Sequence, residues 1–313
     1  MTHRAEIHQR ERDRRKEGRE LYSDSDGIPT FRRSVTSNLD ILGTKAALTS
    51  MTNSDLAEQI RLLDSFSGVL HNSEWEWQWQ RMLTFSDSIA LAVPIQPNSH
   101  GLELSGTIGS IAIYQFELAC TGRFLRGGID VGNAYADYAN ITGPALAEAA
   151  SLESDVAVVP RVLLSDSCLQ LVNDEAARGY EERLVQSEWN SALMIDADSR
   201  AFVDYLKTAL DAESNGVEYA ATLLDKHKKA VSEALDMYSE NVRVREKYVW
   251  VAHYHNAFCE RHQQDRSLMI GEPSLTRLEL HDPHPFQQLF GPDDVAAKKP
   301  RLRVRPRARD RAR

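Results

Sequence analysis

The sequence lacks any apolar run of the roughly 18 residues that a membrane-spanning helix needs. Residues 1–20 are rich in charge and contain no apolar stretch, so we expect no secretory signal. Cysteine is scarce: Cys120, Cys168 and Cys259 lie far apart, and no Cys-x-x-Cys pair occurs. We therefore expect reduced thiols and no zinc site, in a cytoplasmic protein that does not associate with membranes.

Excess positive charge is confined to the C-terminal tail. Residues 298–313 contain nine Lys/Arg and one Asp, which gives +8, and since the whole chain carries −9, residues 1–297 carry −17. An acidic body argues against a nucleic-acid reader, so no nucleic-acid partner is expected. The tail would suit nucleic acid, acidic protein or the acidic body itself, but it has almost nothing to bury, and a solvated, disordered tail is the favoured interpretation.

The composition is ordinary for a soluble globular protein: 42% of the 313 residues are hydrophobic and 27% are charged. The length suits a catalytic domain with a helical appendage. We expect four segments, namely a mobile N-terminal segment (1–30), a catalytic domain (31–172), a helical C-terminal region (173–290) and a basic disordered tail (291–313).

Hydrophobic spacing predicts alternating strands and helices up to residue 164. Strands are expected at 34–42, in a hairpin at 83–93, at 125–132 (broken by close-approach glycines), at 138–142 and at 156–164, and helices at 54–70 (with Ser54 as N-cap), 106–120 and 144–152. From residue 173 onward the pattern is helical almost throughout, with long helices at 217–235 and 244–258. This order indicates an α+β fold, with helices packed on an antiparallel or mixed sheet.

Two further patterns carry structural expectations. Trp75, Trp77 and Trp79 alternate with polar residues, which predicts a strand whose aromatic face packs on the core or on a partner subunit. His253 and His255 are two residues apart on a predicted helix, so they lie on different faces and suit packing or surface positions better than metal binding.

Two acidic residues lie where chemistry is plausible. Asp40 ends the first predicted strand, and the turn through Gly43 then leads into a helical pattern. A carboxylate there can hold a divalent cation against a polyphosphate, although an ordinary strand-to-helix connection is the plainer interpretation. Asp87 lies at the turn of the predicted hairpin, where an acid is usually only a turn former. For Arg126, the plain alternative is a salt bridge at the sheet edge.

Four segments in one order are similar to a known family. They are Asp40-Ile41-Leu42-Gly43, Phe85-Ser86-Asp87-Ser88, Arg126-Gly127-Gly128-Ile129-x-x-Gly132 and Ile141-Thr142-Gly143. Residues 34–165 thus resemble the catalytic domain of class III nucleotidyl cyclases. Within that family the chain most resembles the bacterial pyrimidine cyclases of the Pycsar anti-phage defence system, to which Gly143-Pro144-Ala145-Leu146 and Lys247-Tyr248-Val249-Trp250 also fit.

The resemblance implies a role for each matching residue. Asp40, Asp87 and Arg126 would be the catalytic residues, with two Mn²⁺ or Mg²⁺ ions per site. The implied ligands and contacts are Asp40, Ile41 (through its carbonyl) and Asp87 for the metals, Gly43, Thr44, Lys45 and Arg126 for the phosphates, and Asn140 for the base.

The implied reaction is attack of the ribose 3′-hydroxyl on its own α-phosphate, with pyrophosphate leaving in line. The resemblance implies a homodimer with two equivalent sites at the interface, in which UTP becomes 3′,5′-cyclic UMP and a separate cyclic-nucleotide-binding effector reads the product. CTP, giving cyclic CMP, is the alternative substrate. The amide of Asn140 offers both a donor and an acceptor, so it could pair with uracil or with cytosine. The preference for UTP therefore rests mainly on the resemblance.

The chain departs from the adenylyl cyclase pattern at several positions. Ala147 and Ser151 replace an asparagine and an arginine, Leu83 replaces a lysine that reads the base, and Asn140 replaces an acid. The transition-state charge could then come from Lys45, Arg126 or an arginine elsewhere. A degenerate cyclase fold that binds a nucleotide without turnover remains the second hypothesis, although retention of both acids favours an enzyme.

Overall fold

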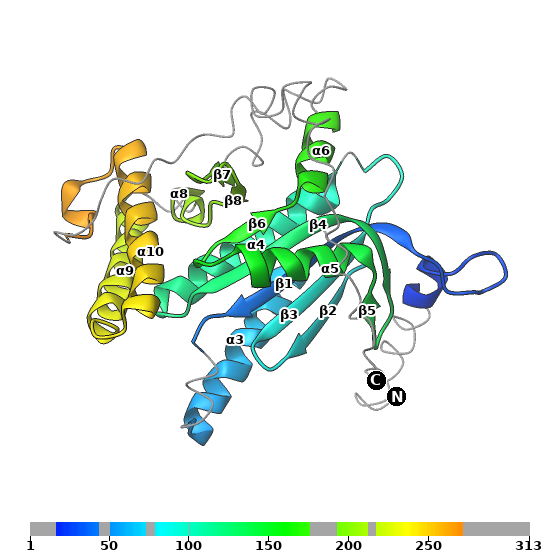
Figure 1. Ribbon diagram of the computed structural model, residues 1–313, viewed down its shortest axis with the longest axis horizontal. Helices are drawn as coiled ribbons and strands as arrows, with labels where there is room; N and C mark the ends of the chain where they lie inside the picture. Colours follow the sequence, from blue (N-terminus) through cyan, green and yellow to red (C-terminus); the bar gives the residue numbers. More distant parts are fainter. Residues whose placement is uncertain are drawn as a thin grey trace, which may run out of the picture. The chain divides into compact units, whose positions relative to one another are not determined.

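A mixed sheet with helices packed on it forms the fold of the computed structural model (Figure 1), which confirms the α+β class predicted from the sequence. The described residues all belong to one compact unit, Met1–Pro283. The structure describes residues 17–43, 51–72, 79–99, 101–175, 193–211 and 217–271.

Within the described ranges the sheet has eight strands: seven follow the order β2-β3-β1-β4-β6-β8-β7, and β5 pairs with β4. Neighbours are antiparallel except β4 and β6, which are parallel. The strands are β1 (Arg32–Ile41), β2 (Arg81–Phe85), β3 (Ser88–Pro94), β4 (Leu125–Ala136), β5 (Ile141–Thr142), β6 (Val162–Leu164), β7 (Leu193–Ile195) and β8 (Ala201–Val203).

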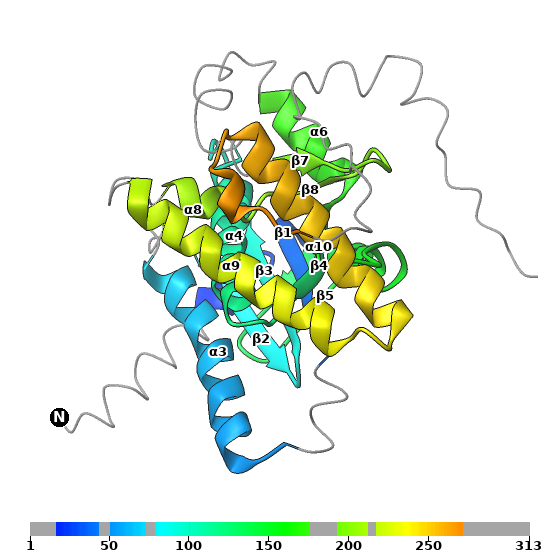
Figure 2. The same ribbon diagram turned by 90° about the vertical axis from the view of Figure 1, so that its left-hand side faces the viewer.

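Helices cover the sheet and one of its ends. In Figures 1 and 2, α5 lies on one face of β1 and β4 while α3 and α4 lie on the other, and the α9–α10 pair lies at the end where β1 stops and β4 starts. The helices are α3 (Asn53–Asn72), α4 (Leu102–Cys120), α5 (Pro144–Ser151), the π-helical η1 (Leu152–Val156), α6 (Asp166–Glu175), α8 (Lys207–Asp211), α9 (Val217–Met237), α10 (Val242–Arg261) and the short η4 (Arg266–Leu268).

The close-approach glycines of β4 bring α5 onto the strand. A Cβ added at Gly128 would lie 2.3 Å from the carbonyl oxygen of Ala149 and 2.6 Å from Cβ of Leu152. Only glycine therefore lets α5 pack directly on the strand backbone. The predicted break in this strand is wrong, since β4 runs continuously from Leu125 to Ala136 and keeps its register with β1 throughout.

Three other predictions need correction. Thr52, not Ser54, caps α3, because its hydroxyl accepts from the Asp55 N–H at 3.3 Å and its own N–H donates to Asp55 Oδ2 at 2.9 Å. The strand expected at 156–164 is reduced to β6, with the π-helical η1 extending α5 to Val156. Residues 193–203, expected to be helical, form the β7–β8 hairpin instead. The sequence pattern does not reveal these strands, because three residues are too few to show a period of two.

Several packing predictions can be compared with the described residues. Cys120, Cys168 and Cys259 are free thiols. His255 is fully buried, and its Nδ1 lies 3.0 Å from Nδ1 of His227. Residues 75 and 77 of the predicted aromatic strand lie outside the described residues, and Trp79 precedes β2 and packs edge-on to the buried Tyr22. Among the described residues, no helix has the length and apolar character needed to span a bilayer.

Candidate active site

Asp40 lies near the end of β1, the strand that pairs with β3 on one side and with β4 on the other. The register places Asp40 opposite Ser88 of β3 and opposite Arg126 of β4. The next residue, Ile41, donates its N–H to the carbonyl of Asp87 at 3.2 Å. The sheet therefore brings together three predicted site residues that are far apart in sequence: Asp40, Asp87 and Arg126.

Asp87 occupies the tight turn between β2 and β3. Phe85 and Ser88 form the last pair of the hairpin, and Ser86 adopts a left-handed φ of 59°. Gln59 of α3 donates to the Ser86 carbonyl at 3.4 Å, which ties the turn to the helix behind it. The predicted hairpin with an acid at its turn is thus present, and its position against β1 sets Asp87 beside Asp40.

Arg126 lies between two carboxylates. Its Nε and Nη2 both donate to Oδ2 of Asp40, each at 3.2 Å. Its Nη2 is also 2.7 Å from Oε1 of Glu153, which η1 carries to the same face of the sheet. The salt bridge considered as the plain alternative for Arg126 is therefore formed, and it lies inside the cluster of predicted site residues.

The acids of this cluster have too little positive charge around them. Burial raises the pKa of the Asp40 carboxyl, Arg126 lowers it, and the neighbouring Asp87 raises it again. Burial likewise raises the pKa of Glu153, which Arg126 lowers and Asp40 raises. The pKa values of these partly buried carboxylates stay raised although an arginine lies beside them. A further cation bound here would therefore lower the electrostatic energy.

Of the three predicted phosphate contacts that follow β1 in sequence, only Gly43 belongs to the described residues. Gly43 has a φ of +85°, a left-handed conformation that glycine adopts without strain, and a Cβ added there would meet nothing within 4 Å. The turn therefore leaves open space next to its backbone. Thr44 and Lys45 lie outside the described residues.

Asn140 lies at the opposite end of β4. It is exposed, and its side chain donates to Oδ1 of Asp137 at 3.2 Å. Between Arg126 and Ala136 the strand rises by ~33 Å at about 3.3 Å per residue. Asn140 and Asp40 of one chain therefore cannot contact the same nucleotide.

The positions that depart from the adenylyl cyclase pattern bring no charge to the cluster. Leu83 lies on β2 opposite Ala90, while Ala147 and Ser151 lie on α5. Ser151 donates to Oδ2 of Asp155 at 3.0 Å. Helix α5 contains no Lys or Arg, so the described cations near Asp40 come from β4 and from α10.

Two residues of the cluster were missed by the sequence analysis as site residues. Glu153 follows α5 in a π-helical turn that no simple period predicts. Lys247 of α10 influences the pKa of Asp40, although some 200 residues separate the two in sequence. The sequence feature that could have drawn attention to Lys247 is the motif Lys247-Tyr248-Val249-Trp250, in which a lysine lies close in sequence to two large aromatic residues.

The donor set fits hard divalent cations that complete their coordination with a substrate. Among the described residues, no group of three or more His, Cys, Asp or Glu is arranged to hold a metal ion by itself. Asp40 and Asp87 offer carboxylate oxygens, and Mg²⁺ is usually bound by one or two carboxylates together with substrate phosphates. The raised pKa of Asp40 also favours a cation at this point.

Comparisons with known proteins show only distant similarity. No family model and no curated protein matches the sequence. Two solved structures described as a bacterial light-regulated adenylyl cyclase are 11% and 13% identical, with TM-scores of 0.36 and 0.31, over 64% and 53% of this chain. The matches span 64% and 56% of those chains, less than two thirds of their lengths.

A third structure is described as a class III adenylyl cyclase-like ATP-binding protein from Pseudomonas aeruginosa. It is 12% identical, with a TM-score of 0.37, over 80% of this chain and 74% of that one. Sequences and folds this distant do not assign a function, so the proposal below rests on the residues of the site.

Proposed function

We propose that this chain is a nucleotidyl cyclase that converts a pyrimidine nucleoside triphosphate, UTP in preference to CTP, into the 3′,5′-cyclic monophosphate and pyrophosphate. The observation that carries the proposal is the convergence of Asp40 and Asp87 at one end of the sheet, with Arg126 of β4 bonded to Asp40 and the Gly43 turn following β1. The order of these motifs, which resembles that of class III cyclases, supports the same reaction.

Two divalent ions, Mn²⁺ or Mg²⁺, would be held by the carboxylates of Asp40 and Asp87, the Ile41 carbonyl and phosphate oxygens. When bound, such ions supply charge that favours loss of the 3′-hydroxyl proton and neutralises the leaving phosphates. The O3′–Pα bond forms while the bond from Pα to the bridging oxygen breaks, and that oxygen leaves with pyrophosphate.

The residues of this chain position the phosphates. Arg126 presents a planar cation, and its guanidinium suits the oxygens of a phosphate as well as it suits a carboxylate. In the absence of substrate Arg126 is held by Asp40 and Glu153. Since Asp40 would turn toward the ions, Arg126 becomes available to the terminal phosphates while Glu153 keeps it on the sheet.

A homodimer follows from the geometry of β4 if Asn140 reads the base. One chain cannot bring Asn140 to its own Asp40, because most of β4 lies between them. A second chain with two-fold symmetry would build the site twice. Mixing an Asp40→Asn chain with an Asn140→Ala chain should then restore activity through one intact composite site. No recovery on mixing would count against a shared site.

The preference for a pyrimidine rests on the base-facing positions. Leu83 offers no cation to a purine ring, and the Asn140 amide offers a donor and an acceptor to the edge of uracil or cytosine. The product would serve anti-phage defence through a separate cyclic-nucleotide-binding effector. Both pyrimidines suit the amide of Asn140, and the resemblance to pyrimidine cyclases favours UTP.

The test is incubation with an equal mixture of the four NTPs and Mn²⁺, with pyrophosphate release measured and products separated by mass. Cyclic UMP is the expected main product, cyclic CMP would reverse the order of the two pyrimidines, and cyclic AMP or GMP would overturn the pyrimidine assignment. Asp40→Asn and Asp87→Asn should each lower turnover by orders of magnitude. Asp64→Asn, which changes an exposed acid of α3, is the matched control and should leave turnover unchanged.

A binder without turnover is the second candidate, and the absence of Lys and Arg from α5 is the observation that favours it. Such a protein would bind Mn²⁺ and an NTP but release no pyrophosphate. Calorimetric binding with no product from any of the four NTPs would favour this function over the cyclase.

A further inference from the structure

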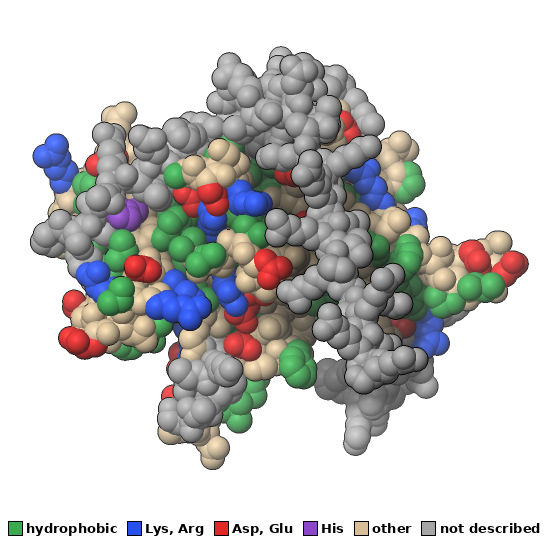
Figure 3. Space-filling model, viewed as in Figure 1, with side chains coloured by type: hydrophobic (Ala, Val, Ile, Leu, Met, Phe, Trp, Pro, Cys, Tyr) green, Lys and Arg blue, Asp and Glu red, His purple; other side chains and the backbone are tan. Residues whose placement is uncertain are grey.

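Helix α10 brings two cations to the end of the sheet that carries Asp40. Arg243 and Lys247 lie four residues apart, so they share one face of the helix. Arg243 is exposed and Lys247 is partly buried. In Figure 3, Lys and Arg side chains gather where α10 meets the sheet, next to Asp and Glu side chains.

An aromatic contact fixes this part of α10 against the strands. Tyr248, the residue after Lys247, packs edge-on to Phe124 with ring centroids 5.2 Å apart. Phe124 directly precedes β4, and its carbonyl accepts from the Leu42 N–H at 2.8 Å. Lys247 is therefore next to the point where β1 leads into the Gly43 turn and β4 begins.

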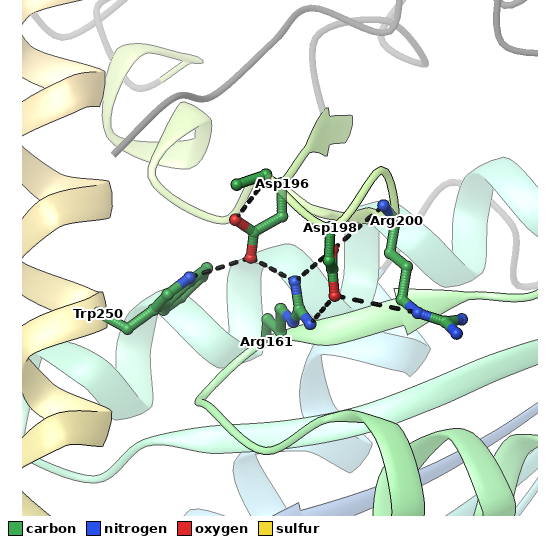
Figure 4. Close-up of polar contacts among 6 residues, drawn as sticks. Arg161, Asp196, Asp198, Arg200 and Trp250 are labelled. Atoms are coloured by element: carbon green, nitrogen blue, oxygen red, sulfur yellow. Dashed lines mark hydrogen bonds and ion pairs between the residues drawn. The ribbon is translucent and has the colours of Figure 1, made fainter. Parts of the chain in front are cut away.

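A polar network holds the next turn of α10 (Figure 4). The indole N–H of Trp250 donates to Oδ2 of Asp196 at 3.0 Å, and the same oxygen pairs with Nη1 of the buried Arg161. Nη2 of Arg161 donates to Oδ2 of Asp198 at 2.6 Å. Figure 4 shows Arg161 between the two acids of the β7–β8 turn, with Trp250 reaching Asp196 from α10.

The same network leads directly to the candidate site. The backbone carbonyl of Arg161 accepts from the N–H of Gly127 at 3.1 Å, and Gly127 follows Arg126 on β4. Since Trp250 is three residues after Lys247, this chain of contacts links the backbone next to Arg126 with the helix that carries Lys247. The position of Lys247 relative to Arg126 is thus set by buried polar contacts rather than by a loose helix end.

The charges around Lys247 suit an anion. Burial lowers the pKa of Lys247, the guanidinium groups of Arg126 and Arg243 lower it further, and Asp40 raises it. Within the described part of the chain, no carboxylate is in ion-pair contact with Lys247. Lys247 is thus a partly buried cation with two arginines near enough to influence it, and such a group of like charges attracts a polyphosphate.

We propose that Lys247, assisted by Arg243, forms a polyphosphate-binding subsite that holds the terminal phosphates of the substrate beside Arg126. The helical C-terminal region thereby supplies part of the active site of its own chain. The proposal rests on the cyclase function for the identity of the substrate, but the subsite itself recognises any chain of two or three phosphates. It also gives α10 a role that neither α5 nor the described part of the Gly43 turn can fill, since neither carries a cation.

Calorimetric titration of the full chain with inorganic tripolyphosphate and Mg²⁺ tests the subsite without any need for turnover. Lys247→Gln should weaken binding by about 10- to 100-fold, as expected for the loss of a charge-assisted contact. Lys247→Arg, which keeps the charge, should retain most of the affinity. Lys229→Gln is the matched control, because it removes the same charge from an exposed position on α9 and should change little.

UMP and thermal unfolding provide the remaining controls. Lys247→Gln should leave the affinity for UMP unchanged, because UMP lacks the terminal phosphates that the subsite holds. The melting temperature should also stay the same, because the substitution is proposed to affect binding and not folding. The proposal is wrong if the wild-type chain fails to bind tripolyphosphate, if Lys247→Gln binds it as tightly as wild type, or if Lys229→Gln weakens binding equally. Binding that depends on Lys247 without turnover of any NTP would instead retain the subsite and overturn the cyclase, so the two proposals fail separately.

Discussion

Replacing Gly128 with alanine is the most direct test of how the fold holds the site. The added Cβ would lie 2.3 Å from the Ala149 carbonyl oxygen and 2.6 Å from Cβ of Leu152. Neither atom can rotate away, because one belongs to the backbone and the other is fixed to it. The substitution must therefore push α5 away from β4.

The cost can be estimated from similar core substitutions. Overpacking destabilises by about 1–3 kcal/mol, and each kcal/mol lowers the melting temperature of a domain of this size by roughly 2–4 °C. We therefore expect Gly128→Ala to melt about 2–12 °C below the wild-type chain. Because α5 leads into η1, the displacement also moves Glu153 away from Arg126, so turnover should fall even at temperatures where the variant is folded.

Thermal unfolding followed by circular dichroism measures the effect, with Gly109→Ala as the matched control. Gly109 lies inside α4, and a Cβ added there would meet no atom within 4 Å. Alanine is the better helix former by about 1 kcal/mol, so this variant should melt at or above the wild-type temperature. If Gly128→Ala melts no lower than wild type, the close contact between β4 and α5 is wrong, and equal destabilisation of both variants would point to a general cost of losing glycine.

Three further outcomes follow from the buried polar groups. Burial lowers the pKa of His255 to about 4, whereas an unfolded chain protonates histidine near pH 6.5. The contribution of the neutral His255 to the free energy of unfolding is therefore fully present above pH 6.5 and is lost as the pH falls toward 4, and His255→Gln should flatten the slope of melting temperature against pH in this range. Trp250→Phe should destabilise by about 1–3 kcal/mol, because Asp196 loses a buried donor, and should raise KM for the triphosphate more than it lowers kcat; unchanged values of both would show that Trp250 does not position α10. Burial raises the pKa of Asp40, so protons compete with metal for its carboxylate at higher pH than for an ordinary aspartate; Mn²⁺ affinity measured by calorimetry should therefore increase with pH until Asp40 is ionised, and Asp40→Asn should remove this dependence.

The sequence was sufficient for the central part of the fold because its patterns there are long or chemically distinctive. The predicted strand at 34–42 and helix at 106–120 correspond to β1 and α4, whose apolar residues repeat over several turns or pairs. The hairpin turn at Asp87 was predicted from two apolar runs around Ser86-Asp87-Ser88. The short strands β7 and β8 were missed because each has only three residues, all of them buried, which is too few to show a period of two.

For the site, the predicted proximity of Asp40, Asp87 and Arg126 is present in the structure, while their roles stay a prediction. Local motifs could identify these residues because each lies at the end of a recognisable strand. Lys247 could not be placed in the same way, since an amphipathic helix shows which face is buried but not which strand that face will meet. Its location depends on the ring contact of Tyr248 and the hydrogen bond of Trp250, which form only in the folded chain.

The anchoring of α10 has a consequence for the time at which the protein matures on the ribosome. Chains are synthesised from the N-terminus, and domains generally fold as their residues emerge. Asp196 must emerge 35 residues after Arg161 before their ion pair can form, and Trp250 follows Asp196 by a further 54 residues. The strands that carry Asp40 and Arg126 are therefore complete long before α10 can dock on them. A nascent chain at that stage holds Asp40, Asp87 and Arg126 without Lys247, so the proposed polyphosphate subsite is completed only after α10 has been synthesised and has docked.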